Sequence, residues 1–174
     1  MPVTPYHFGP SSFIGLVFRK WLDIPVFVLA NIIVDLEVLI INSFGLGYPF
    51  HRYCHTLLIG SVVGLLWGAS AYPLRHFFNR LMKILRISYQ TSFRKMLISG
   101  VLGVWIHVLI DGIYHWDARV FWPSRARPLY RLLSRQQVEV VCLALFAAAL
   151  IVYVIMLAFS YKSRADQTGE KTHN

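Results

Sequence analysis

Four stretches of this chain are each long enough and apolar enough to cross a lipid bilayer, and they restrict the possible folds more than any other feature. They cover Ile24 to Ile41, Thr56 to Tyr72, Met96 to Tyr114 and Val138 to Phe159. Lipid offers backbone groups no water, so a spanning segment of about 17 to 25 residues has to be helical. With 56% hydrophobic residues among 174, the chain is also too apolar for a soluble fold of this size. We therefore expect an all-α, polytopic integral membrane protein.

The segments between these stretches complete a predicted bundle of four or five membrane helices. The apolar piece SSFIGLVF starts after Pro10 and stops at Arg19, so it is either a short span or a half-buried interfacial helix. Residues 74–93 alternate apolar and basic side chains at helical spacing, which is typical of an amphipathic interfacial helix. We expect a single transmembrane domain over residues 1–160 and a polar, disordered tail over residues 161–174. The segment MPVTPYHFGP has no positively charged region, so a cleaved signal peptide is not expected.

The basic residues predict how the chain is oriented in the membrane. Lys and Arg number 17 against 8 Asp and Glu, and in a membrane protein such an excess reflects topology and lipid headgroups rather than a nucleic-acid partner. The loop of residues 74–95 carries six of these cations, which places it in the cytoplasm together with the C-terminal tail. Residues 42–55 and 115–137 then share the opposite face.

Glycines recur every four residues in the second apolar stretch, at Gly60, Gly64 and Gly68. Small residues at this spacing let a neighbouring helix approach closely. In a chain this short the favoured use is packing within the bundle, and the alternative is a contact between two copies in a homo-oligomer. The two cysteines, Cys54 and Cys142, are too few for a disulfide framework.

Ionisable residues occur inside these apolar stretches in a pattern that indicates a site. Such residues cost a few kcal/mol each within a membrane and normally face the interior of the bundle. Asp35 lies in the first stretch. His107, Asp111 and His115 follow one another at four-residue steps in the third, which puts them on one side of a helix. By the predicted topology, Asp35 and His107 both lie about two helical turns from the same face of the membrane.

The segment HRYCHT, residues 51–56, adds two histidines at the lip of the second stretch. His51 and His55 are four residues apart and would project together from a helix, and His7 reaches the same face if the first helix crosses. Imidazole and carboxylate are the ligands that suit zinc and related divalent ions, and such groups would be poorly satisfied in a membrane without an ion. We therefore predict a divalent metal site, with zinc as the expected ion, built from the following residues: His7, Asp35, His51, His55, His107 and Asp111.

Other polar residues can be assigned roles other than metal ligation. Glu37 points about 200° away from Asp35 on a regular helix, so orienting a ligand or lying at the membrane interface is as well supported as ligation. For His115, a ligand and a solvated or capping residue are equally supported. Cys54 is expected to serve packing, and His76 and His173 are expected to be solvated.

Five motifs occur in an order that resembles a known family. TPYH, VDLE, HRYCHT, HVLID and FWPSR follow one another between about residue 4 and about residue 128, as in the bacterial membrane-bound metal-dependent hydrolases, which include LexA-binding inner-membrane proteins. The resemblance implies a multi-pass inner-membrane protein whose metal centre uses the six residues named above. Glu37 and Cys54 depart from the pattern, since many members have Asp and Thr there. The HxxxD element is also similar to that of zinc-dependent phospholipases C.

The function that we predict is hydrolysis of an ester or phosphoester of a lipid or lipid-linked substrate by metal-activated water. Asp35 or Asp111 would hold this water or take its proton, and Arg52 would grip phosphate oxygens. The arginines at 119, 125 and 127 either do the same or meet anionic headgroups. Two other classes stay open: a non-catalytic metal-binding scaffold or transporter, and a membrane cytochrome in which His55 and His107 hold haem.

Overall fold

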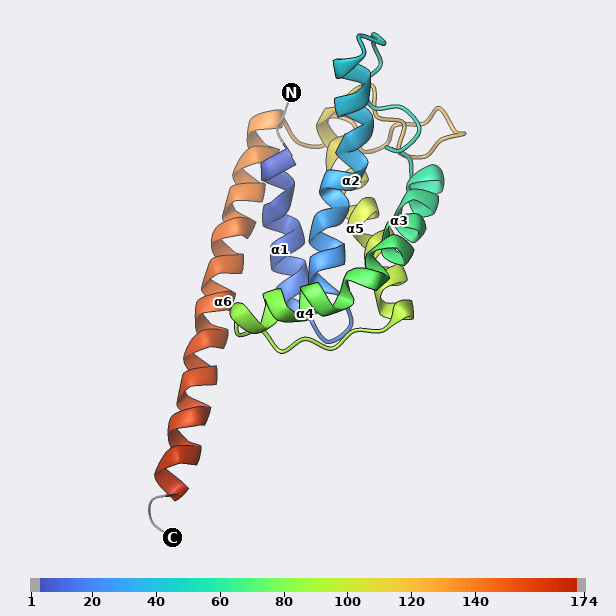
Figure 1. The fold of residues 1–174 in the computed structure, drawn as a ribbon. Coiled ribbons are helices and arrows are strands. Elements are labelled where there is room, and N and C mark those ends of the chain that lie inside the picture. Colours follow the sequence, from blue (N-terminus) through green and yellow to red (C-terminus); the bar gives the residue numbers. More distant parts are fainter. Residues whose placement is uncertain (1–3, 172–174) are drawn as a thin grey trace.

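The computed structural model describes the backbone of residues 4–171 and the side chains of residues 5–161. Within this part of the chain there are six α-helices, two short 3-10 helices and no strand. The α-helices are α1 (Phe8–Val17), α2 (Ile24–Ser43), α3 (Leu57–Ala71), α4 (Arg75–Ile84), α5 (Phe93–Tyr114) and α6 (Arg135–Lys171), and the 3-10 helices are η1 (Thr4–His7) and η2 (Tyr72–Leu74). Figure 1 shows a bundle in which α4 crosses one end.

Four helical segments are long and apolar enough to cross a membrane, which confirms the predicted membrane bundle. They are Ile24–Ser43, Leu57–Ile84, Phe93–Tyr114 and Arg135–Tyr161. Helix α1 is only ten residues long, or about 15 Å, which is half of a hydrocarbon core of about 30 Å. It packs against α2 and α6 inside the bundle. Helix α6 continues to Lys171, beyond the start of the predicted tail at residue 161, and the side chains of residues 162–174 lie outside the described residues.

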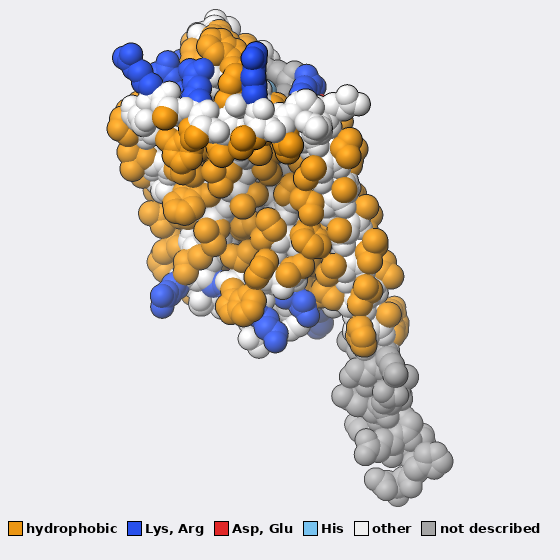
Figure 2. Space-filling model, turned by 180° about the vertical axis from the view of Figure 1, so that it is seen from behind, with side chains coloured by type: hydrophobic (Ala, Val, Ile, Leu, Met, Phe, Trp, Pro, Cys, Tyr) orange, Lys and Arg blue, Asp and Glu red, His pale blue; other side chains and the backbone are white. Residues whose placement is uncertain are grey.

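The two loops that carry the site meet at one end of the bundle. Successive long helices run in opposite directions, so residues 44–56 and 115–134 lie at the end opposite α4 (Figure 1). This is the arrangement predicted from the basic residues. Figure 2 shows Lys and Arg side chains at both ends of the molecule and a hydrophobic band between them.

The interfacial helix is shorter than predicted. The sequence indicated residues 74–93, whereas α4 ends at Ile84 and residues 85–92 form a loop. The reason is a C-terminal cap in which Arg86 adopts a positive φ of 56° and the Ile87 N–H donates to the Met82 carbonyl oxygen at 2.9 Å. Met82 and Ile87 are packed in the same buried cluster, which completes the capping motif.

A buried carboxylate fixes this loop to the bundle. Asp23 caps the start of α2 by accepting a hydrogen bond from the Val26 N–H at 3.2 Å. Its other oxygen accepts hydrogen bonds from the Tyr89 hydroxyl at 2.7 Å and from the Thr91 hydroxyl. The backbone N–H of Asp23 donates to Ser99 on α5 at 2.7 Å. Asp23 therefore ties α2, the loop and α5 together, a role that its position in the sequence did not reveal.

The glycines of α3 set its register against α5. A Cβ atom on Gly64 would lie 2.6 Å from the Cα of Val101, and one on Gly60 would lie 2.8 Å from a methyl group of Val104. This is the packing within the bundle that the sequence favoured. Because the helices are antiparallel, the residues just before α3 lie level with His107 on α5.

The topology predicts that Arg80, on α4, and Arg125, in the loop after α5, face opposite sides of the membrane. Single cysteines at these exposed positions, R80C and R125C, placed in a Cys54→Ser, Cys142→Ser background, should react with an impermeant thiol reagent from opposite sides. Reaction of both positions from one side would contradict the bundle orientation.

Candidate metal centre

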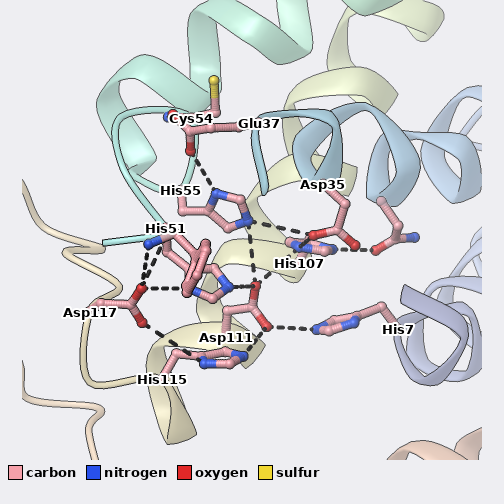
Figure 3. A network of polar contacts seen from close by, with 12 residues as sticks. His7, Asp35, Glu37, His51, Cys54, His55, His107, Asp111, His115 and Asp117 are labelled. Carbon is pink, nitrogen blue, oxygen red and sulfur yellow. Dashed lines mark hydrogen bonds and ion pairs between the residues drawn. The ribbon is translucent and has the colours of Figure 1, made fainter. Parts of the chain in front are cut away.

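The six predicted ligands come from different segments and converge on one place. His7 ends η1, Asp35 lies on α2, and His107 and Asp111 lie on α5. Figure 3 shows that His7, His51, His55 and His107 face Asp111, and that Asp35 faces His55 and His107. The structure therefore brings all six residues together in one cluster.

The histidines of HRYCHT do not form the helical pair that their spacing suggested. Helix α3 begins only at Leu57, because the Thr56 hydroxyl caps it by accepting from the Ile59 N–H at 3.1 Å. His51 and His55 therefore lie in the preceding loop. Their rings nevertheless contact each other edge to face, with centroids 4.7 Å apart, and both Nε2 atoms point to Asp111.

Four of the residues form a compact set that we call the inner group: Asp35, His55, His107 and Asp111. The His107 Nε2 atom lies 3.2 Å from Asp35 Oδ1 and 3.2 Å from Asp111 Oδ2. The His55 Nε2 atom lies 3.6 Å from each of the same two oxygens. Ligand atoms of a tetrahedral zinc site, with bonds of about 2.0 to 2.1 Å, are about 3.4 Å apart. The inner group thus has the spacing of a metal site.

Glu37 orients His55. Its Oε2 atom lies 2.9 Å from His55 Nδ1, and its carboxylate also accepts hydrogen bonds from the backbone N–H groups of Arg52, Tyr53 and Cys54. A carboxylate bonded to Nδ1 leaves the Nε2 lone pair for a metal. Of the roles left open for Glu37 by the sequence, the structure supports the orienting one.

Asn31 orients His107 in the same way. The Asn31 side-chain nitrogen donates to the Val28 carbonyl at 2.7 Å and to the Ser11 hydroxyl at 2.8 Å. Since a carbonyl can only accept, the Asn31 oxygen faces His107 Nδ1, which lies 3.2 Å away. Nδ1 therefore carries the proton, and the Nε2 lone pair of His107 points at two carboxylates.

The geometry of this arrangement fits a positive charge between the two imidazoles and the two carboxylates. The Nε2 atoms of His55 and His107 are buried, and neither has a hydrogen-bond partner in the part of the chain that the structure describes. Lone pairs that face carboxylate oxygens in a buried site are unfavourable unless a positive charge lies between them. The donor set, the spacing and the two orienting acceptors all fit a divalent metal ion, so this group could hold one.

The remaining histidines also lie around Asp111. His7 stacks on His107, with ring centroids 4.2 Å apart, and its Nε2 atom lies 3.1 Å from Asp111 Oδ1. The His51 Nε2 atom lies 3.7 Å from Asp111 Oδ2. His51, His115 and Asp117 form a second set of possible ligands, which we call the outer group.

Asp117 is the site residue that the sequence analysis missed. Its Oδ2 atom lies 3.0 Å from His51 Nδ1 and accepts hydrogen bonds from the N–H groups of Phe50 and His51. Burial raises the pKa of Asp117, but these bonds outweigh burial and lower it to about 2. The one available signal was that Asp117 is the sole acidic residue between 112 and 138.

Two other candidates are turned away from the inner group. The Arg52 guanidinium donates to the backbone carbonyls of Leu46, Gly47 and Pro49, so it closes its own loop. The Cys54 thiol points away from the histidines (Figure 3). Burial and the Glu37 carboxylate raise the pKa of Cys54 to about 11, so it stays a protonated thiol and a poor ligand.

A polar cavity of about 320 Å³ opens beside the outer group. It is lined by Pro49, His51, Arg52, Tyr53, Thr56, Asp117, Arg119 and Trp122. These residues come from the two loops at the end of the bundle opposite α4. A solute at this end could therefore reach the outer group through the cavity.

No family model, curated protein or solved structure matches this chain. The resemblance to membrane-bound metal-dependent hydrolases thus rests on the five sequence motifs. The geometry of the inner group is an independent observation.

Replacing Glu37 with Gln should weaken metal binding by about 10-fold or more, because a neutral amide is a weaker acceptor for the His55 Nδ1–H than a carboxylate and loss of such an orienting partner typically lowers affinity 10- to 100-fold. Zinc affinity can be measured by competition with a chelator in detergent. The matched control is Glu139→Gln, which removes the charge that pairs with Arg135 on α6. Equal zinc affinities for the two variants would contradict the role of Glu37.

Proposed function

We propose that this protein is a membrane-embedded, zinc-dependent hydrolase of the bacterial inner membrane that cleaves a phosphoester of a lipid or lipid-linked substrate. The observation that carries the proposal is the inner group. Two buried imidazole Nε2 atoms without hydrogen bonds meet two carboxylate oxygens at 3.2 to 3.6 Å. The five motifs add the family resemblance.

The side chains of the four residues of the inner group differ in how far they are exposed. The side chain of Asp35 is 23% exposed, whereas those of His55, His107 and Asp111 are 3% exposed or less. We assign the three buried side chains as lasting ligands, which leaves one position open, as in catalytic zinc sites. A divalent ion held there would supply a Lewis acid and activate a water. We assign Asp35 as the group that would receive the proton of that water.

Aromatic and basic side chains around the site support a substrate at the level of the headgroups. Tyr48 stacks on Trp116 with ring centroids 5.0 Å apart, and the Arg127 guanidinium lies over the same indole. Such aromatic residues are enriched at membrane–water interfaces. Arg119 lines the polar cavity and could pair with phosphate oxygens there. A phosphoester in a lipid headgroup fits this combination.

An apolar cavity of about 260 Å³ between α1, α5 and α6 supports a lipid rather than a water-soluble substrate. Ile110 and Ile113, on either side of Asp111 in the sequence, line it, and so does Pro10, three residues after His7. Its lining is entirely apolar and includes Leu133, Val138, Val141 and Leu145. The acyl chain of a bilayer lipid could lie there, next to the helix that carries Asp111.

One rival function is favoured by a specific observation. Four protein ligands already lie together, with Nε2-to-oxygen distances of 3.2 to 3.6 Å, and four protein ligands are what closed structural zinc sites have, which supports a non-catalytic scaffold or transporter. Haem is less well supported, because the oxygens of Asp35 and Asp111 lie against both Nε2 atoms, where the porphyrin would have to be.

The proposal is tested with purified, zinc-loaded protein and a panel of phospholipids and lipid-linked phosphates. Asp35→Asn should keep its zinc and lose turnover by about 100-fold or more, as expected for loss of a general base. His107→Ala should lose both zinc and turnover. His76→Ala, an exposed histidine on α4 at the far end of the bundle, should behave as the wild type.

Two results would contradict the proposal. Full turnover in Asp35→Asn would remove the assigned proton acceptor. Stoichiometric zinc in the wild type without turnover of any lipid in the panel would favour the closed, non-catalytic site.

A further inference from the structure

The outer group lies between the inner group and the polar cavity. One nitrogen or oxygen atom each from His51, His115 and Asp117 lies within 4.8 Å of the others. His51 precedes α3 and the other two residues follow α5, so the group joins the two loops at the site end of the bundle. The function proposed above assigns these three residues no task.

The contact of His51 with Asp117 is a hydrogen bond, but the contacts of His115 with carboxylates are not. The His51 Nδ1 atom lies 3.0 Å from Asp117 Oδ2, which is an ordinary hydrogen-bond distance. The His115 Nδ1 atom lies 3.9 Å from the other oxygen of Asp117, and its Nε2 atom lies 4.0 Å from Asp111 Oδ1. Both distances are too long for hydrogen bonds. His115 thus faces two carboxylates without bonding directly to either.

Backbone hydrogen bonds hold the Asp117 carboxylate in place. Asp117 accepts the N–H groups of Phe50 and His51 at 3.0 and 3.1 Å, which holds its carboxylate against the loop before α3. The rings of His51 and His115 lie 4.0 Å apart between centroids. Two imidazoles and one carboxylate therefore surround a common point, and these are the ligand types that suit zinc.

The same point is within reach of the solvent and of the inner group. His51 and Asp117 line the polar cavity together with Arg119. Asp111 connects the two groups, since its Oδ2 atom lies 3.2 Å from His107 Nε2 and its Oδ1 atom faces His115. A carboxylate between two sets of ligands is the arrangement that a pair of neighbouring ions needs.

We propose that His51, His115 and Asp117 bind a second divalent ion beside the one in the inner group, with Asp111 between them. This inference rests on the proposed function and narrows its substrate class. Two neighbouring ions stabilise both the attacking and the leaving oxygen in the hydrolysis of a phosphoester. A phosphoester entering by the polar cavity would meet the outer ion first, with Arg119 beside it.

Metal content tests the proposal independently of activity. Purified full-length protein, dialysed against zinc in detergent and freed of unbound ions, should contain two zinc ions per chain by elemental analysis. His115→Ala and Asp117→Asn should each contain one. Asn keeps an oxygen that accepts the Phe50 and His51 N–H groups, so the second variant preserves the loop. His76→Ala should retain two ions.

Manganese gives a second readout. Wild-type protein loaded with Mn²⁺ should give the electron paramagnetic resonance spectrum of a coupled pair, and His115→Ala should give that of a single ion. One zinc in the wild type that His107→Ala loses and His115→Ala keeps would overturn the second ion and leave the proposed function standing. No bound zinc would overturn both proposals, and two ions kept in both outer variants would overturn the assignment of these residues.

Discussion

The carboxylate of Asp111 is the interaction on which this structure depends. It is buried near the end of α5, where an uncompensated charge would cost several kcal/mol. His107 and His55 face one of its oxygens, and the other lies near His7 and accepts a hydrogen bond from the Tyr114 hydroxyl at 3.0 Å. The N-terminal segment, the loop before α3 and α5 are thereby held at one point. A metal ion at this point would supply the positive charge that the buried groups require.

Two further layers of packing place the groups around Asp111. The glycines of α3 allow the backbone of α5 to come close, and the register of this contact brings His55 level with His107. Glu37 and Asn31 on α2 then orient the imidazoles of His55 and His107. Glu37 accepts a hydrogen bond from His55 Nδ1, and Asn31 accepts one from His107 Nδ1. The contact between α3 and α5 sets the position of the two histidines, and α2 sets the orientation of their rings. The site therefore forms only when the bundle is assembled.

The sequence predicted the parts of this account that depend on local patterns. Spans of about 20 apolar residues and the four-residue step from His107 to Asp111 each follow from one physical rule. The loop conformation of His51 and His55 could not be predicted, because it depends on contacts with Glu37, which lies on another helix. Asp117 was missed because a single carboxylate in a loop has no periodicity, and its contacts with Phe50 and His51 are likewise distant in the sequence. The early end of α4 follows from the positive φ of Arg86, a residue whose type gives no such signal.

Anomalous X-ray diffraction at the zinc absorption edge, from crystals of the zinc-loaded protein, tests the central claim most directly. The account predicts an anomalous peak bounded by the Nε2 atoms of His55 and His107 and by oxygens of Asp35 and Asp111. A peak at another position, such as the Cys54 thiol, would contradict it. So would the absence of a peak at the inner group together with direct hydrogen bonds between these imidazoles and carboxylates.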